Sequence, residues 1–315
     1  MRCVVLREGE LEVVERETPQ PGPRDVVVAV RAAGLNSADL LQRQGLYPAP
    51  PGWPVDVPGM EMAGVIAAVG EDVHEALLGR RVCGIVGGGA QASHCLIPSE
   101  HLIVVPDHVN WNEAGGFAEA FLTAHDALVT QGALRAGQRV LISGATGGVG
   151  CAAVQIAHRL GAHVTAVTRS DEHHDALHSL GADATVTLDD VAALEPVDVV
   201  LELVGAAHLR LALGVLAPFA HIVVIGVGNG GGRLELELHR IMATRATLTG
   251  STLRSRSREE KATVIERASE TLAPLWASAE LTVPVSRSFA LNDVAQAYDY
   301  FAQPGKFGKV ILVVE

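Results

Sequence analysis

The stretch Gly144-Ala-Thr-Gly-Gly-Val-Gly150 decides the fold of this chain. An apolar run at 139–143 leads into it, and a helical pattern of apolar residues at 151–160 follows it. This order predicts a strand, a tight turn and a helix N-terminus. A second apolar run at 163–168 follows at the distance that a βαβ unit needs, so we expect these elements to begin a parallel sheet.

Glycines at fixed positions of this turn indicate what it binds. Counted from Ala145, the spacing is Ala-x-Gly-x-x-Gly. Gly147 allows the backbone to approach a phosphate closely, and Gly150 allows the helix to pack on the strand. The N–H groups and dipole at the helix start favour a pyrophosphate, so we predict dinucleotide binding. The residues expected to contact the cofactor here are Ala145, Thr146, Gly147, Gly148, Val149 and Gly150.

The end of the second strand indicates which dinucleotide is bound. A Rossmann unit usually carries Asp or Glu there to bind the ribose 2′-hydroxyl, but this chain has Thr168, Arg169 and Ser170. Because a cation suits a 2′-phosphate, the sequence favours NADP(H) over NAD(H). The alternative is that Arg169 is a solvated residue after a strand. Asp171 is interpreted as the N-cap of the following helix.

Composition argues against several classes of function. The chain has 315 residues and a formal net charge of −12, whereas nucleic-acid backbones are bound by basic surfaces, so we expect no nucleic-acid partner. Its four Cys show no Cys-x-x-Cys spacing, which predicts free thiols and a cytoplasmic location. The N-terminus does not resemble a signal peptide. Gly and Pro interrupt the uncharged run 211–228, so we interpret it as sheet core rather than a membrane span.

The rest of the chain contains two regions with different patterns of apolar residues, which predict two domains. Up to about residue 106, short apolar segments separated by Pro and Gly predict a mostly β unit, with one helix at 37–45 capped by Ser37. The middle region predicts a doubly wound α/β sheet with strands at 139–143, 163–168, 184–188, 198–203, 221–227 and 246–250.

The end of the chain is assigned back to the first domain. A helix from 259, a strand at 283–289, a helix at 291–301 and a strand at 310–314 are unlikely to extend the parallel sheet. The predicted domains are therefore 1–118 with 256–315, which is discontinuous, and 119–255. We expect the cofactor cleft between them, at the carboxyl ends of the Rossmann strands.

Motifs along the full length carry a family resemblance. They are the glycine turn and the stretches 33–39, 42–47, 58–64, 87–91, 250–256 and 305–310. On these residues the chain resembles the medium-chain dehydrogenases/reductases, and within them the zinc-free quinone oxidoreductases, or zeta-crystallin-like group. The stretches 42–45, 87–91 and 253–256 are similar to a subgroup that includes the p53-inducible quinone reductase of animals. The resemblance implies that the discontinuous domain is GroES-like and binds the substrate.

The zinc ligands of related enzymes are missing here. The resemblance places a Cys where Asn36 stands and a His where Met60 stands, and the four-Cys structural lobe is absent. Met is a poor zinc ligand and a catalytic zinc needs three protein ligands of N, S or O type, so we predict no metal. His173, His174 and His178 are interpreted as a solvated helical face.

Without a Lewis acid, an electron-poor acceptor is the easier substrate for hydride transfer. The resemblance places Asn36 and Tyr47 beside the nicotinamide, where they contact the acceptor. From the residues alone, an Asn in a turn and a half-buried Tyr are the favoured interpretations, and the resemblance reverses that preference for contact but not for acid catalysis. The resemblance further implies cofactor contacts from Thr123, Val204, Gly226, Val227, Ser251, Thr252 and Leu253.

Three functions follow from this reading. The first is an NADPH-dependent, zinc-independent quinone oxidoreductase. The second is an NADPH-dependent enoyl or alkenal double-bond reductase, which the sequence separates poorly because loops at 45–56 and 254–258 shape the acceptor pocket. The third is a non-catalytic NADPH-binding protein, such as a sensor or a crystallin-like protein. The expected small-molecule partner is a quinone or an enone.

The last strand of the predicted parallel sheet indicates a homodimer. The segment 246–252, Ala-Thr-Leu-Thr-Gly-Ser-Thr, has no charge and no Pro, so it lacks the devices that protect an open sheet edge. We expect two copies to pair this edge across a two-fold axis.

Overall fold

The computed structural model describes residues 1–228 and 232–314. It divides into two compact units, one of Met1–Leu122 with Leu253–Glu315 and one of Thr123–Thr252. The boundaries placed from the sequence at 118/119 and 255/256 lie within four residues of these limits. The predicted fold class, an α/β chain with a doubly wound parallel sheet and a discontinuous, mostly β unit, is confirmed.

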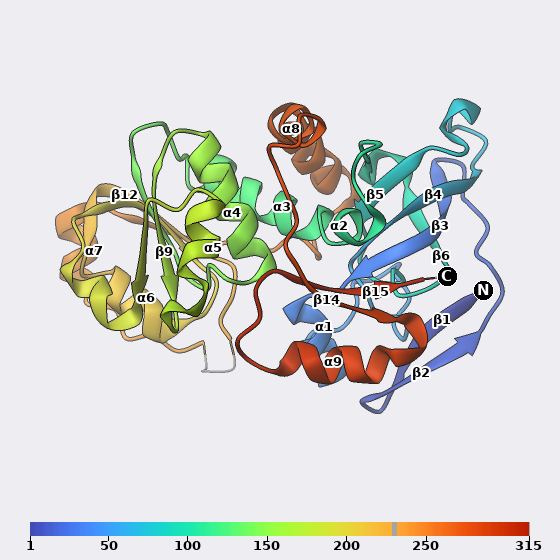
Figure 1. The fold of residues 1–315 in the computed structure, drawn as a ribbon, viewed down its shortest axis with the longest axis horizontal. Coiled ribbons are helices and arrows are strands. Elements are labelled where there is room, and N and C mark those ends of the chain that lie inside the picture. Colours follow the sequence, from blue (N-terminus) through green and yellow to red (C-terminus); the bar gives the residue numbers. More distant parts are fainter. Residues whose placement is uncertain (229–231, 315) are drawn as a thin grey trace. The chain divides into compact units, whose positions relative to one another are not determined.

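The second unit is a Rossmann fold (Figure 1). Its six strands run parallel in the order β10-β9-β8-β11-β12-β13. They are β8 (Arg139–Ile142), β9 (His163–Thr168), β10 (Ala184–Thr187), β11 (Val197–Glu202), β12 (Leu216–Val224) and β13 (Thr247–Gly250). The helices of this unit are α4 (Gly148–Arg159), α5 (His174–Ser179), α6 (Ala206–Ala212) and α7 (Leu238–Thr244).

The strand order positions the site of this unit. From β8 the chain moves to β9 and β10 on one side, and it then returns to β11 on the other side of β8. Open α/β sheets bind ligands at the carboxyl ends of the strands beside such a reversal. The strand β8 is apolar and buried after its first residue, because helices cover both faces of a parallel sheet.

Two details of this unit differ from the sequence-based expectation. The strand β12 begins at Leu216 rather than at 221, because the chain stays extended on both sides of an irregularity at Phe219, where φ is +65°. The pairing of β12 with β11 shifts register at the same place. Asp171 is not an N-cap: it is the first residue of a 3₁₀ turn whose N-cap is Ser170.

The first unit is mostly β, as predicted. A sheet of order β14-β15-β3-β4-β5-β7, with β6 also paired to β3, lies beside a β1-β2 hairpin. The strands are β1 (Arg2–Arg7), β2 (Glu10–Glu15), β3 (Asp25–Gly34), β4 (Glu61–Val69), β5 (Arg81–Ile85), β6 (His94–Pro98), β7 (Leu102–Val104), β14 (Val285–Ala290) and β15 (Lys309–Val313). The helices are α1 (Ser37–Arg43), α2 (Trp111–Gly115), α8 (Arg258–Ala277) and α9 (Val294–Ala302), and α3 (Ala118–His125) spans the boundary with the second unit.

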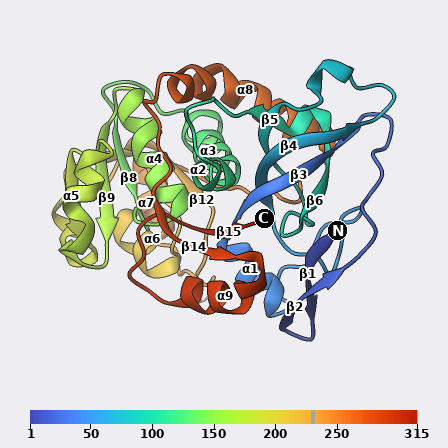
Figure 2. The same ribbon diagram turned by 45° about the vertical axis from the view of Figure 1, so that its right-hand side comes forward.

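The two chain segments of the first unit share one core. The C-terminal strand β15 pairs antiparallel with β3 from the N-terminal segment. Val310 and Leu312 of β15 pack in the same apolar cluster as Val28 of β3 and Ile97 of β6. Figure 2 shows α9 running along β14 and β15. Removing either segment would expose this core, so the discontinuous domain folds as one body.

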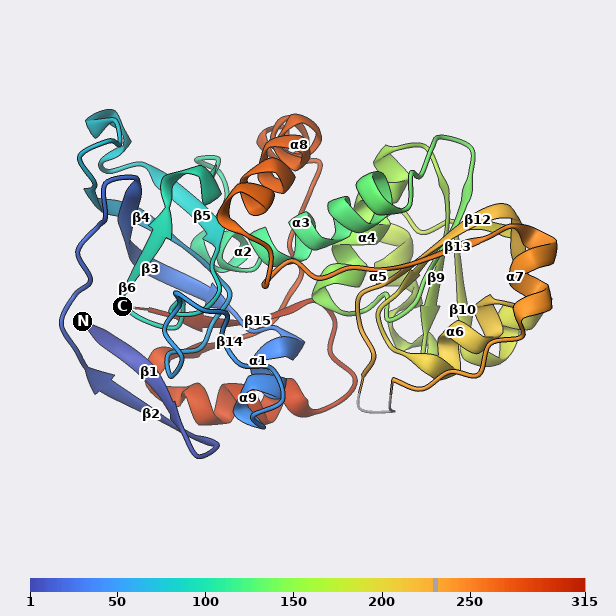
Figure 3. The ribbon, with the colours of Figure 1, turned by 180° about the vertical axis from the view of Figure 1, so that it is seen from behind.

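The strand β13 lies at one edge of the Rossmann sheet, next to β12 and near α7 (Figure 3). Leu248 in this strand is 42% exposed, and Leu238 and Met242 on α7 are exposed as well. In the part of the chain that the structure describes, β13 pairs with β12 alone.

Candidate functional site

The glycine turn connects β8 to α4, and its backbone leaves no space for a side chain at Gly150. A Cβ there would lie 2.6 Å from Cα and 2.7 Å from the carbonyl carbon of Ala145. The close contact is thus between α4 and the turn itself, whereas we expected it on the strand. Gly144 has a φ of +60°, which favours glycine. Gly147 is the helix N-cap, and a Cβ there would meet only the Gly144 carbonyl, at 3.5 Å.

The start of α4 presents unused hydrogen-bond donors. The helix ladder begins where Cys151 N–H donates to the Gly147 carbonyl at 2.8 Å. The N–H groups of Gly148, Val149 and Gly150 have no acceptor among the described residues. Donors at the positive end of a helix of 12 residues fit a pyrophosphate. The turn residues predicted from the sequence therefore form a site of the expected chemistry.

Glu202, at the end of β11, organises the neighbouring strand ends, and the sequence analysis missed it. Its side chain is 1% exposed. Oε1 accepts hydrogen bonds from the hydroxyl of Ser143 at 2.8 Å and from the N–H groups of Val204 and Gly205 at 2.6 and 2.7 Å. Oε2 is buried and has no hydrogen-bond partner among the described residues. An acidic residue ending an apolar strand, three positions before Gly205, was the available signal.

The predicted nicotinamide-side residues gather at the carboxyl ends of β11, β12 and β13. Val204 follows β11, and Gly226 donates its N–H to the Glu202 carbonyl at 3.2 Å. A Cβ on Gly226 would lie 2.8 Å from the carbonyl carbon of Leu203, so the backbones touch. Val227 is half exposed beside this contact. The structure thus brings three of the predicted residues together, namely Val204, Gly226 and Val227.

Further along this edge, Ser251 and Thr252 follow β13. The Ser251 N–H donates to the Val224 carbonyl at 3.0 Å, and its hydroxyl donates to Asp126 Oδ2 at 3.3 Å. Thr123 is buried in α3, and its hydroxyl has no hydrogen-bond partner among the described residues. Such an orphaned hydroxyl is the kind of group that a bound ligand satisfies. Leu253 is buried and belongs to the first unit.

The end of β9 carries the residues predicted to select the cofactor. Thr168 is buried, and its hydroxyl donates to the Ser170 carbonyl at 2.7 Å. It also lies 3.0 Å from Nε2 of His174. Arg169 is exposed and has no hydrogen bond or ion pair within the described residues. Thr168 thus fixes the loop, and the Arg169 guanidinium is available to a ligand.

The histidines near this loop are not a merely solvated face, as the sequence suggested. His174 contacts the Thr168 hydroxyl, and Nδ1 of His178 lies 2.7 Å from the Ala182 carbonyl. A donor on each ring therefore holds α5 against its neighbours. Helical periodicity could not reveal these bonds, because both partners lie outside the helix.

In the first unit, Asn36 is the N-cap of α1, a role we had given to Ser37. Oδ2 of Asp39 accepts the Asn36 N–H at 2.8 Å, which closes the helix start. The Asn36 amide is occupied on both sides. Nδ2 donates to Glu61 Oε1 at 3.0 Å and to the Gly34 carbonyl at 3.3 Å, and Oδ1 accepts from Lys309 at 2.7 Å.

Lys309 and Glu61 form a buried ion pair at the centre of this polar cluster. The Lys309 ammonium lies 2.6 Å from Glu61 Oε1 and donates to the Leu35 carbonyl at 2.8 Å. Glu61 Oε2 accepts the N–H of Glu119 at 2.9 Å. The pair is thus fully hydrogen-bonded, as a buried pair must be to be tolerated. The sequence analysis missed both residues, which lie 248 positions apart.

The cluster does not fit a zinc ion. The Asn36 oxygen and Glu61 Oε1 already bind an ammonium, and the Met60 side chain is buried and neutral. In the part of the chain that the structure describes, no group of three or more His, Cys, Asp and Glu is placed to hold a metal. The absence of a catalytic metal stays a prediction.

Tyr47 lies against Arg254, a second residue that the sequence analysis had not singled out for chemistry. The buried Arg254 guanidinium is 5.2 Å from the Tyr47 ring and donates to the Tyr47 carbonyl at 3.1 Å. It also donates to Gln42 Oε1 at 2.6 Å and to the Gly87 carbonyl at 2.8 Å. Burial raises the pKa of the Tyr47 hydroxyl, so it stays protonated at neutral pH. The Arg254 side chain thus connects its own motif, 250–256, to the motifs 42–47 and 87–91.

Glu119 has a carboxyl whose pKa is raised into the neutral range. Burial, with Glu61 close by, raises the pKa of its carboxyl to about 7. Burial also raises the pKa of Asp39 to about 6. The Glu119 carboxyl makes no hydrogen bond within the described residues, whereas Lys309 and Lys261 are cations near it. Nothing in the local sequence distinguishes Glu119 from an ordinary helix residue.

We expect the first unit to lose stability as pH rises from about 4.5 to 7. The folded state holds the Glu119 proton up to about pH 7, whereas the unfolded chain releases it near the ordinary value of 4.5. Unfolding therefore releases a proton in this window, and Asp39 adds the same sign at the lower end. The decline from Glu119 alone should be about 3 kcal/mol, measured by denaturant titration at several pH values. Glu119→Gln should remove the Glu119 part of the decline and leave the part due to Asp39, and an unchanged slope would contradict the assignment.

No helix among the described residues has the length and apolar content needed to cross a membrane.

Comparison with known proteins places these sites in a family. Residues 22–133 match the family described as alcohol dehydrogenase GroES-like domain, and residues 148–270 match the family described as zinc-binding dehydrogenase. The chain is 29% identical to a synaptic vesicle membrane protein VAT-1 homolog of Rattus norvegicus over 99% of this chain and 84% of the relative.

Two solved structures are similar over nearly the whole chain. A quinone oxidoreductase of Pseudomonas syringae is 28% identical, with 99% of both chains covered and a TM-score of 0.85. The CurK enoyl reductase is also 28% identical, with 100% of this chain and 99% of that chain covered and a TM-score of 0.86.

Proposed function

The chain belongs to the medium-chain dehydrogenase/reductase superfamily, in its zinc-free quinone oxidoreductase-like group, and we propose that it is an NADPH-dependent quinone reductase. The observation that carries the proposal is the combination of a pyrophosphate-type turn in the Rossmann unit with a first unit in which Lys309 binds Asn36 and Glu61. Asn36 stands where the resemblance places a zinc ligand. An oxidoreductase without a Lewis acid is best suited to an acceptor that is already electron-poor.

The Rossmann unit supplies the cofactor site of this proposal. Gly148, Val149 and Gly150 offer N–H donors to the pyrophosphate, and Arg169 offers its charge to a 2′-phosphate. The unpaired hydroxyl of Thr123 adds a donor or acceptor. When bound, NADPH supplies a hydride from nicotinamide C4.

The first unit supplies the groups proposed to hold the acceptor. The nitrogen and the oxygen of the Asn36 side-chain amide are both hydrogen-bonded within the protein. We therefore propose that Asn36 positions its neighbours and that the Tyr47 hydroxyl contacts the acceptor oxygen. A quinone that accepts a hydride also takes up a proton to become a hydroquinone. Glu119 is able to hold that proton at neutral pH, and it lies close enough to act electrostatically on Tyr47.

A panel of acceptors tests the function. NADPH consumption at 340 nm is measured with 1,4-naphthoquinone, 9,10-phenanthrenequinone and 2-alkenals of several lengths. We expect the quinones to give the higher kcat/KM. The similarity to CurK enoyl reductase favours double-bond reduction as the second candidate, which the opposite order would support. NADPH binding without turnover of any acceptor would indicate a non-catalytic protein.

We expect Arg169→Ala to remove most of a preference for NADPH over NADH. A charge-assisted contact to phosphate contributes about 1.5 to 3 kcal/mol, which corresponds to about 10- to 100-fold in Kd. Calorimetric titration of both cofactors measures this. Arg169→Lys keeps the charge and should keep part of the preference. An equal loss for NADPH and NADH would contradict the assignment of Arg169.

We further propose that the chain forms a homodimer through β13. The Ser251 N–H donates to β12, and donors alternate along a parallel strand, so the N–H groups of Leu248 and Gly250 face away from β12. Leu248 and Met242 add exposed apolar side chains near this edge. Unpaired donors with apolar neighbours favour pairing with a second copy.

Leu248→Pro should therefore give a monomer or an aggregate, because it removes a donor on the outward side of β13. Leu248→Ala keeps the N–H and is the matched control, which should stay dimeric. Light scattering after size-exclusion chromatography at micromolar concentration measures the mass. A monomeric wild-type protein would show that this edge does not pair.

A further inference from the structure

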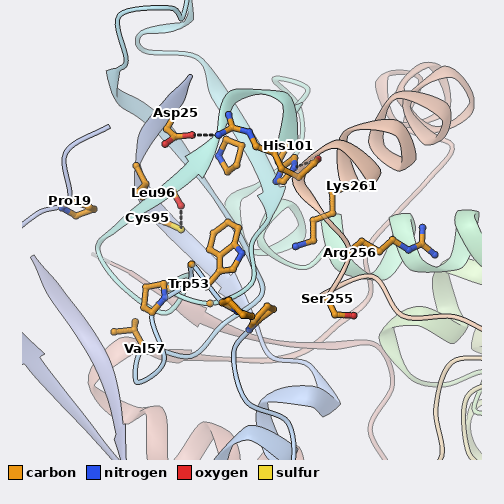
Figure 4. Close-up of a pocket in the computed structure, with 18 of the residues that line it drawn as sticks. Pro19, Asp25, Trp53, Val57, Cys95, Leu96, His101, Ser255, Arg256 and Lys261 are labelled. Atoms are coloured by element: carbon orange, nitrogen blue, oxygen red, sulfur yellow. Dashed lines mark hydrogen bonds and ion pairs between the residues drawn. The ribbon is translucent and has the colours of Figure 1, made fainter. Parts of the chain in front are cut away.

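A cavity of about 510 Å³ lies within the first unit (Figure 4). It is lined by the loop from Pro50 to Pro54, by Val57, by β6 and by the segment from Ser255 to Lys261. These are parts of the two loops, 45–56 and 254–258, to which the sequence analysis assigned the acceptor pocket. We call it the Trp53–Lys261 cavity.

Lys261 is a buried cation that interacts electrostatically with Glu119 but forms no ion pair with it. Its side chain is 2% exposed, and it makes no hydrogen bond or ion pair within the described residues. The ammonium lies 5.4 Å from the centre of the Trp53 ring, and Figure 4 shows it extending from α8 toward that ring. Burial lowers the pKa of Lys261. A buried ammonium usually has a carboxylate partner, because removing it from water is costly.

The position of Lys261 on its helix also favours an anion beside it. It lies in the first turn of α8, where the helix dipole disfavours a cation and favours an anion. The neighbouring Arg258 is neutralised, since it contacts Asp25 at 2.9 Å and Glu100 at 2.6 Å. The positive charge facing the cavity is therefore not compensated by these acids.

The other walls of the cavity suit a flat ring. Trp53 lies on Gly87, where a Cβ would be 2.5 Å from indole Cγ and 2.7 Å from Nε1. The glycine thus creates the place for the indole, which explains part of the Gly-Gly-Gly-x-Gln motif. Prolines 50, 51 and 54 add apolar surface. A ring stacked beside Trp53 would bury apolar area and leave its substituent near the ammonium.

We propose that the Trp53–Lys261 cavity binds a conjugated organic anion, with the ring beside Trp53 and the anionic group on the Lys261 ammonium. The inference deepens the proposed function, on which it rests, by naming the acceptor as an anionic quinone or enone. Tyr47 does not line the cavity, but its carbonyl accepts a hydrogen bond from Arg254, the residue next to Ser255 of the cavity wall. His101 lines the same cavity, and its Nδ1 is buried without a partner among the described residues. It offers a second polar contact to the same ligand.

Direct binding tests the cavity independently of turnover. Naphthalene-2-sulfonate is titrated calorimetrically into wild-type protein, Lys261→Gln, Lys261→Arg and Lys306→Gln. We expect Lys261→Gln to raise the Kd about 10- to 100-fold, as for loss of a charge-assisted contact. Lys261→Arg should restore much of the affinity, and Lys306→Gln, which removes the same charge outside the cavity, should leave it unchanged. Equal Kd values for wild-type protein and a folded Lys261→Gln variant would overturn the proposal.

Turnover then tests whether the anion is the acceptor. The ratio of kcat/KM for 1,4-naphthoquinone-2-sulfonate to that for 1,4-naphthoquinone should fall about 10- to 100-fold in Lys261→Gln. Gly87→Ala, which displaces the indole, should weaken sulfonate binding in a protein whose Lys261 is intact. An unchanged ratio would overturn the acceptor assignment. Lack of activity with either quinone would contradict the proposed function, while the calorimetric result would still decide the cavity.

Discussion

Gly150→Ala should abolish cofactor binding. The added methyl group would overlap the backbone of Ala145 and Gly144, which are not flexible side-chain ends, so the turn and α4 must move apart. This displaces the N–H groups that we assign to the pyrophosphate. Loss of two charge-assisted hydrogen bonds corresponds to at least about 100-fold in the Kd for NADPH, with about 3 kcal/mol lost from the stability of the Rossmann unit. Calorimetric titration and circular dichroism during denaturation measure the two effects.

Gly147→Ala is the matched control for the effect on stability. A Cβ at Gly147 meets only the Gly144 carbonyl at an ordinary contact distance, and the backbone there suits any residue. The variant should therefore keep the stability of the wild-type protein within about 1 kcal/mol. It should still bind NADPH more weakly, because the methyl group lies where a phosphate approaches. Wild-type affinity in Gly150→Ala would exclude the glycine turn as the cofactor site.

Lys309→Met should destabilise the first unit by about 3 to 5 kcal/mol, because it leaves the Glu61 carboxylate buried without its cation. All three tryptophans, Trp53, Trp111 and Trp276, belong to the first unit, so their fluorescence during urea titration reports this loss. The double variant Lys309→Met with Glu61→Gln should recover part of the stability, since no charge then stays buried. If the double variant is as unstable as the single one, the pair does not act as described.

The sequence predicted the Rossmann unit well because its signals are local. The glycine turn, the apolar runs and their spacing lie within the stretch 139–168, and each parallel strand is apolar enough to be recognised by itself. The predicted start of β12 was wrong because Pro218 indicates a turn, whereas the strand continues through an irregularity at Phe219. Such continuity depends on pairing with β11, which one segment cannot reveal.

The candidate site was predictable only in part. Residues on the glycine turn and at strand ends follow from the motif, but Glu202, Glu119 and Lys309 gain their roles from partners distant in sequence. The Asn36 amide illustrates the limit. The resemblance gave it contact with the acceptor, and the structure shows its donors and acceptor engaged by Glu61, Gly34 and Lys309. Burial and long-range pairing decide such roles, and neither is encoded in spacing.

A single turnover by metal-free protein tests the central claim most directly. Protein dialysed against a chelator and shown by elemental analysis to hold less than about 0.1 metal per chain is mixed with NADPH and 1,4-naphthoquinone. We expect stoichiometric loss of absorbance at 340 nm with formation of the hydroquinone, at a rate that added zinc does not raise. Absence of hydride transfer until zinc is restored would contradict it.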